Sequence, residues 1–233
     1  MSGKILCISS GAVASLYYGR NKGWFCSDHR ELERFKRLVR HYHLFVERDR
    51  AEKDLGLVQL IPSCVIATGT KILCLQRSRN AARSELKSKW TSLFGGHVDE
   101  TDKDAGDGWQ TVLNGVRREV REELGIEIAE SSPQLAGLAI DPSNRTGRIH
   151  LGVIFYFTAA SEQVRLHGEL DLEEFEIEGS KTVSFFSPKR VHSVQNQFDP
   201  WSTLFFNSDF ARWQLQPEFC GEEDLPLLQA ARG

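Results

Sequence analysis

The hydrophobic positions of this chain repeat with two different periods, which separate expected helices from expected strands. Apolar residues recur every three or four positions in residues 28–40 and 109–124, and this spacing predicts two amphipathic helices. The apolar stripe of the second helix ends at Leu124, and Gly125 follows it as a typical C-terminal cap.

Short apolar runs rich in β-branched and aromatic residues predict the strands. These runs are residues 4–9, 57–68, 71–77, 90–98, 135–140, 150–159 and 182–187. Gly69 and Thr70 separate two of them, so we expect a hairpin there. Residues 41–57 are highly charged and are expected to be a connection, whereas the aromatic-rich residues 191–233 are expected to form helices packed on the core. Strands and helices that mix without regular βαβ alternation indicate the α+β class.

Composition and charge narrow the function classes. The chain has 233 residues, 40% hydrophobic and 26% charged, which suits a folded, soluble protein. A net charge of -3 gives no strong nucleic-acid signal and no attraction to an anionic membrane. No apolar run approaches the ~20 residues of a membrane helix.

The cysteines and the N-terminus bear on the compartment. Five cysteines without a CxxC pair favour buried thiols in a reducing environment. Ala12-Val13-Ala14 resembles a signal-peptidase site, but polar residues interrupt the apolar stretch before it, which fits a strand better. We therefore expect a cytoplasmic protein.

The second helix ends in an unusual concentration of acids. Glu119, Glu122 and Glu123 fall within about 60° of one another on a helical wheel, at the end where the helix dipole disfavours carboxylates. Like charges at this spacing also repel by roughly 0.2–0.5 kcal/mol per pair. Three oxygen ligands in one place suit a hard divalent cation such as Mg²⁺ or Mn²⁺. The alternative is a solvated helix end neutralised by its three arginines, which are Arg117, Arg118 and Arg121.

A longer pattern surrounds these acids. Gly95-Gly96 follows a short strand upstream, and the helix then runs as Arg-Glu-aliphatic-any-Glu-Glu-any-Gly-aliphatic from Arg118 to Ile126. This resembles the second half of the Nudix box, the signature of the Nudix (MutT-type) hydrolases. The order of elements through residues 57–190 is similar to that family as well. Ile61-Pro62 and Trp201-Ser202 resemble features of a bacterial group of predicted MutT-family phosphoesterases.

The first half of the box departs from the family pattern. Gly96 and Arg118 are 22 positions apart, which is longer than the family spacing. Gln110 stands where the family has a glutamate. The three acids that could replace it are Asp102, Asp104 and Asp107, unless the role is missing. The insertion itself, residues 99–107, is expected to be a solvated acidic loop.

The resemblance implies a fold and a division of the chain. We expect an α+β, Nudix-like α/β/α sandwich with a mixed sheet and additions at both ends. Residues 1–56 would be an N-terminal extension packed on the core, and 57–190 the Nudix domain. Residues 191–233 would be a C-terminal helical segment of the same domain.

The resemblance also implies an activity. The chain would be a metal-dependent hydrolase that cleaves a diphosphate linkage in a small-molecule nucleoside diphosphate derivative. Glu119, Glu122 and Glu123 would bind Mg²⁺ or Mn²⁺, with Glu119 as an alternative catalytic base. Arg118 would hold the carboxylates, and Gly95-Gly96 would let the backbone approach the substrate.

Several further residues are weaker candidates. A fourth acid from a later loop is expected among Glu169, Glu173, Glu174 and Glu176. The remaining candidates are His97, His150, Gly115, Tyr42, Phe45 and Trp90, with a structural role as the simpler alternative, and Arg77 and Arg79, with a surface charge as the simpler alternative.

Two other function classes remain open on the sequence. A nucleotide-sensing module with the same fold would explain Gln110 and the insertion, but would not need three crowded acids. An isomerase acting on an isoprenoid diphosphate would need a cysteine and a glutamate facing the substrate, and no cysteine lies near the box in sequence. The residues leave open whether the chain forms a homodimer.

Overall fold

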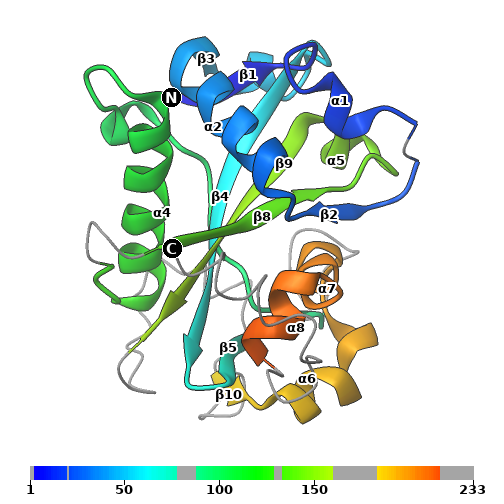
Figure 1. Ribbon diagram of the computed structural model, residues 1–233. Helices are drawn as coiled ribbons and strands as arrows, with labels where there is room; N and C mark the ends of the chain where they lie inside the picture. The colour runs from blue at the N-terminus through cyan, green and yellow to red at the C-terminus, as the bar shows by residue number, and fades with distance from the viewer. Residues whose placement is uncertain (1–2, 20, 78–87, 129–132, 160–182, 216–233) are drawn as a thin grey trace.

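Strand β4 (Leu57–Thr68) is the centre of the fold, as its long apolar run predicts. The computed structural model describes residues 3–19, 21–77, 88–128, 133–159 and 183–215, and Figure 1 shows their arrangement. β4 pairs in parallel with β9 (His150–Thr158) along nine register positions. It also pairs in antiparallel fashion with β1 (Lys4–Ser9) and β5 (Lys71–Gln76). The last pairing confirms the predicted hairpin.

Ten strands of the described residues join in one sheet, with a central order of β10-β5-β4-β9-β8-β2. β1, β3, β6 and β7 attach beside this path. The other strands are β2 (Trp24–Cys26), β3 (His43–Glu47), β6 (Trp90–Thr91), β7 (Phe94–Gly95), β8 (Gln134–Ile140) and β10 (Val183–Phe186). Because β4 and β9 are parallel and the other strand pairs are antiparallel, the sheet is mixed, as expected.

Helices cover both faces of the sheet. On one face, α2 (His29–Tyr42) and α4 (Gly108–Leu124) bury their apolar stripes in a core with β4, β8 and β9. On the other face, α7 (Pro200–Phe206) and α8 (Asp209–Leu215) pack on a second, aromatic-rich core. The remaining helices are α1 (Ala14–Tyr17), α3 (Arg48–Ala51), α5 (Arg145–Ile149) and α6 (Pro188–Ser193). These three layers are visible in Figure 1 and confirm the α/β/α class.

The prediction that residues 41–57 are only a connection is wrong. They contain β3, which pairs with β1 from Lys4↔Glu47 to Ile8↔His43, and the short helix α3. β3 is an edge strand with no fully buried residue, and its apolar run is only three residues long (44–46) and lies next to charged residues. β1 belongs to the same sheet as β4, and the division at residue 56 stays a prediction. Helices are confirmed in residues 191–215, while 216–233 lie outside the described residues.

Candidate active site

The rotation of α4 places its acids. Every fourth residue of the apolar stripe, from Val112 to Leu124, has no exposed surface, so this face of the helix is fixed against the sheet. Asp107 caps the beginning of α4 by accepting a hydrogen bond from the Trp109 N–H (2.8 Å). Gly125 ends it in the left-handed conformation (φ 64°) that favours glycine. The three glutamates of the last two turns are therefore held beside the buried face.

The Gly95-Gly96 loop lies directly against two of these glutamates. The Gly95 N–H donates a hydrogen bond to the Glu123 carboxylate. A Cβ added to Gly96 would lie 2.7 Å from Glu119 Oε1, so only a glycine admits the carboxylate at this distance. Gly95 has a φ of 151°, and a Cβ there would collide with the Pro62 carbonyl oxygen. The loop that the sequence singled out and the acidic helix end thus form one unit.

Arg118 ties the acids of this unit together. Its Nε and Nη2 donate to the two carboxylate oxygens of Asp102 at 2.9 and 3.0 Å. Its Nη1 lies 2.7 Å from Glu122 Oε2 and 3.1 Å from Glu119 Oε1. Its Nη2 also donates to the His97 carbonyl oxygen at 2.9 Å. The hydrogen bonds to Asp102 are the largest cause of the raised pKa of Arg118, so the guanidinium stays charged.

Asp102 is the acid of the insertion that reaches the box. Its side chain is only 3% exposed, and besides holding Arg118 it accepts a hydrogen bond from the Asp99 N–H at 3.0 Å. The expectation of a solvated acidic loop is therefore wrong at this position. Burial of the carboxylate is compensated by the two-pronged contact with the guanidinium.

The other two candidate acids have local roles. Asp104 Oδ1 accepts hydrogen bonds from backbone N–H groups of its own turn, and Asp107 is the cap of α4. Gln110 donates to Asn114 Oδ1 at 3.0 Å, and Asn114 in turn donates to the Asp102 carbonyl oxygen. Of these two positions, residue 102 forms the ion pair with Arg118 in this structure, and residue 110 does not contact it.

The carboxylates are under electrostatic strain. Burial is the main cause that raises the pKa of Glu119, against the opposing charge of Arg118. Burial also raises the pKa of Glu123 to about 8, and the nearby charge of Glu119 adds to this shift. A divalent cation would relieve both effects, because it supplies positive charge beyond that of Arg118 and Arg77.

The donor set fits a hard cation, although the acids are not arranged around a shared point. In the described part of the chain, no three His, Cys, Asp or Glu side chains form a group that could hold a metal as it stands. Glu122 and Glu119 are drawn toward Arg118 instead. Carboxylate oxygens are the ligands that Mg²⁺ and Mn²⁺ prefer, and the raised pKa of Glu123 indicates a site that lacks positive charge.

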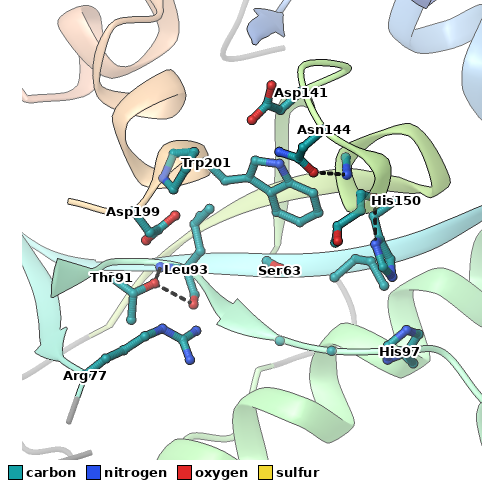
Figure 2. Close-up of a pocket in the computed structure, with 16 residues that line it drawn as sticks. Ser63, Arg77, Thr91, Leu93, His97, Asp141, Asn144, His150, Asp199 and Trp201 are labelled. Carbon is teal, nitrogen blue, oxygen red and sulfur yellow. Dashed lines mark hydrogen bonds between the residues drawn. The ribbon is translucent and has the colours of Figure 1, made fainter. Parts of the chain in front are cut away.

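A cavity of about 340 Å³, shown in Figure 2, is lined by Gly95 and Gly96 of the Gly-Gly loop. Its wall comes from β4, the β6–β7 region, the segment around α5 and the beginning of α7. Arg77, which the sequence favoured as a surface charge, is half-buried in this wall. Trp201 also lines it, a role that the sequence did not indicate.

Both candidate histidines line this cavity and share one buried partner. His97 Nε2 and His150 Nε2 lie 2.9 and 3.1 Å from Gln59 Oε1. His150 Nδ1 lies 2.9 Å from the Thr146 carbonyl oxygen, so that nitrogen carries a proton and donates. The hydrogen bonds of the pair hold the strand ends together at the edge of the cavity.

Most of the weaker candidates have structural surroundings. Gly115 faces Val98, whose methyl would lie 2.9 Å from an added Cβ, so helix packing explains this glycine. Trp90 is buried against Phe186, with ring centroids 4.7 Å apart, and Tyr42 is 64% exposed. Arg79 and the acids of residues 169–176 lie outside the described residues.

Comparison with known proteins adds the family. The chain is 26% identical over 158 residues to Protein YmaB of Bacillus subtilis (strain 168), which covers 67% of this chain and 73% of that protein. The fold is similar to the crystal structure of Tm1382, assigned to the Nudix hydrolases, with a TM-score of 0.63 and 23% identity over 86% of this chain and 94% of that one. None of the helices in the described ranges has the length and hydropathy of a bilayer span.

The family itself is matched directly. The NUDIX domain family matches residues 60–206, which include the acidic helix end, the Gly-Gly loop and the beginning of α7. The predicted resemblance to the Nudix (MutT-type) hydrolases, and with it the prediction of an enzyme, is confirmed at the level of the family. The chain belongs to the NUDIX domain family.

Proposed function

We propose that this protein is a metal-dependent Nudix hydrolase that cleaves a diphosphate linkage in a nucleoside diphosphate derivative. One observation carries the proposal: the Gly95-Gly96 backbone borders both the acidic end of α4 and a cavity. A substrate in this cavity would bring its phosphates to the loop, within reach of cations held by the acids. The reducing compartment expected from the cysteines makes the cytoplasm the proposed location; the four described cysteines are free and buried.

We assign Glu119, Glu122 and Glu123 as the ligands of Mg²⁺ or Mn²⁺. Such an ion, when bound, neutralises phosphate oxygens and lowers the pKa of a bound water. The contribution of the chain is to orient the carboxylates: Gly95 N–H holds Glu123, and Arg118 holds the other two. The charge of Arg77 lowers the pKa of Glu123. Arg77 also lines the cavity, where its guanidinium would bind a substrate phosphate.

The contact between Gly96 and Glu119 gives a test of this assignment. An alanine at residue 96 would push the flexible end of Glu119 away while leaving the fold in place. We expect Gly96→Ala to weaken Mn²⁺ binding about tenfold and to change the free energy of unfolding by less than about 1 kcal/mol. Titration calorimetry and thermal unfolding measure the two effects. Gly106→Ala is the matched control, because a Cβ there would meet nothing within 4 Å; equal Mn²⁺ affinity in both variants would remove Glu119 from the ligand set.

The structure weakens both alternatives. The sensing module was favoured by the missing glutamate at residue 110, but Asp102 now supplies a carboxylate to Arg118. The isomerase would need a cysteine facing the substrate, and the four described cysteines are at most 3% exposed. The hydrolase therefore remains the better proposal.

The decisive experiment is a phosphate-release screen over nucleoside diphosphate derivatives, with Mg²⁺ or Mn²⁺ and with chelator. We expect turnover of at least one compound that requires the metal and falls at least about tenfold in Glu122→Gln. Glu127→Gln, an exposed glutamate outside the proposed site, should keep full activity. If no compound is turned over and Glu122→Gln binds nucleotide as well as the wild type, the sensing module replaces the hydrolase.

A further inference from the structure

The cavity beside the Gly95-Gly96 loop has charges of opposite sign in different parts of its wall. Arg77 belongs to the part near the acids, since its charge acts on Glu123. Asp141, which directly follows β8, belongs to the wall near α5. Figure 2 shows Arg77 at the lower left and Asp141 in the upper part of the view, with Trp201 between them. A ligand with phosphates at one end and neutral hydrogen-bond donors at the other matches this distribution of charge.

Trp201 is held in place from two sides. The Asp199 carboxylate caps α7 by accepting hydrogen bonds from the Ser202 N–H (3.0 Å) and the Ser202 hydroxyl (2.5 Å). Ser202 Oγ also accepts from the Ser92 N–H at 3.1 Å, which ties α7 to the segment after β6. The six-membered ring of the indole lies over Gly152 of β9, where an added Cβ would be 3.1 Å from Cε3 and Cζ3.

This support leaves part of the indole directed to the cavity. Trp201 keeps some exposed surface although its neighbours Ser202 and Phe205 are buried, and Figure 2 shows the ring projecting into the middle of the view. A rigid aromatic ring on a cavity wall is suited to stack on another flat ring. The contact with Gly152 accounts for the packing of one part of the ring, but not for the part that lines the cavity.

Asp141 supplies an acceptor at the same end. Its Oδ1 accepts a hydrogen bond from the Ser143 N–H at 3.1 Å, and its Oδ2 makes no hydrogen bond within the described ranges. A carboxylate oxygen accepts from N–H and O–H groups and repels phosphate. The end of the cavity at Asp141 therefore selects a neutral, donor-bearing group. Asp199 lies in another part of the wall, beside β6, where its N–H donates to the Trp90 carbonyl oxygen (2.8 Å) and its carboxylate accepts from Ser202.

We propose that the cavity binds the nucleoside of the substrate, with its base stacked on Trp201 and an N–H or O–H donor on Asp141. The phosphates would then lead past Arg77 to the Gly95-Gly96 loop. This inference rests on the proposed function for the identity of the substrate class. It goes further by assigning the residues that recognise the nucleoside and its direction in the cavity.

Binding in chelator, without turnover, tests the inference separately from hydrolysis. By calorimetry and tryptophan fluorescence, we expect AMP to bind more tightly than ribose 5-phosphate or pyrophosphate. Trp201→Leu should weaken AMP about tenfold, whereas Trp201→Phe, which keeps a ring, should stay within about threefold. Trp213→Leu is the control, because Trp213 lies on α8 and does not line the cavity. Circular dichroism verifies that each variant is folded.

Asp141→Asn and 2′-deoxy-AMP separate the two kinds of donor. The variant should weaken AMP by about tenfold and reduce its preference over pyrophosphate. If the wild type binds 2′-deoxy-AMP about as weakly as Asp141→Asn binds AMP, the ribose 2′-hydroxyl donates to Asp141. If the wild type binds 2′-deoxy-AMP as tightly as AMP, a base N–H donates to Asp141. The inference fails if Trp201→Leu leaves AMP affinity unchanged or if ribose 5-phosphate binds as tightly as AMP. Either failure would leave metal-dependent hydrolysis, measured independently, intact.

Discussion

Glu123→Gln is expected to remove hydrolysis and, at the same time, to make the metal-free protein more stable. Glutamine keeps an oxygen that can accept the Gly95 N–H, so the loop stays in place. It removes a half-buried negative charge that lies beside Glu119. We expect turnover to fall at least about a hundredfold, because loss of a metal ligand costs several kcal/mol of transition-state stabilisation.

The gain in stability should depend on pH in a defined direction. Burial raises the pKa of Glu123 to about 8 in the folded state, above the ordinary value of 4.5. A carboxyl group shifted in this direction binds its proton more tightly in the folded protein, so it lowers stability as pH rises from 4.5 toward 8. Glu123→Gln should therefore match the wild type at low pH. Above pH 8 it should be more stable by about 1–3 kcal/mol, or roughly 2–4 °C for each kcal/mol.

Thermal unfolding in chelator at a series of pH values measures this difference. Adding Mn²⁺ should stabilise the wild type and leave the variant nearly unchanged. Glu127→Gln removes an exposed carboxylate nearby and should shift neither the unfolding midpoint nor the activity. If Glu123→Gln is less stable than the wild type at high pH, the negative charge of Glu123 is already balanced by its surroundings. The description of the metal-free site as lacking positive charge would then be wrong.

The sequence predicted the parts of this site that depend on local periodicity. The apolar stripe of α4 and the cap at Gly125 place the three glutamates on one side, and no distant contact is needed to see this. The Gly-Gly loop was also predicted from local sequence, because glycines at the end of a strand indicate an unusual backbone conformation. The structure added that Gly95 donates to Glu123, which depends on how β7 pairs with β4.

Residues that act through tertiary contacts could not be chosen from the sequence. Three aspartates of the insertion were equivalent candidates, and only the fold shows that Asp102 reaches Arg118 while Asp107 caps α4. Trp201 is brought to the cavity from a helix far along the chain, and its glycine partner on β9 carries no signal of its own. β3 was missed because this edge strand has an apolar run of only three residues, 44–46, next to a charged segment.

Removal of the Arg118 side chain is expected to damage both folding and activity. Arg118→Met would leave the Asp102 carboxylate, which is 3% exposed, without its cation, and Glu119 and Glu122 would lose the same partner. Breaking a buried ion pair from one side costs about 3–5 kcal/mol. Arg118→Lys keeps a charge but cannot make the two-pronged contact with Asp102. Chemical denaturation should therefore rank the lysine variant between wild type and methionine.

The role of Asp102 follows from the same contacts and can be separated from that of Gln110. Asp102→Asn should lower turnover about 10–100-fold, because it loosens the arginine that orients the proposed ligands. Gln110→Glu should not restore that loss, since residue 110 is bonded to Asn114 and not to Arg118. A double-mutant cycle of residues 102 and 118 should give a coupling above about 1 kcal/mol, and one of residues 110 and 118 should give almost none. Rescue by Gln110→Glu would mean that the family position still serves the site, and that Asp102 is only a structural contact of the inserted segment.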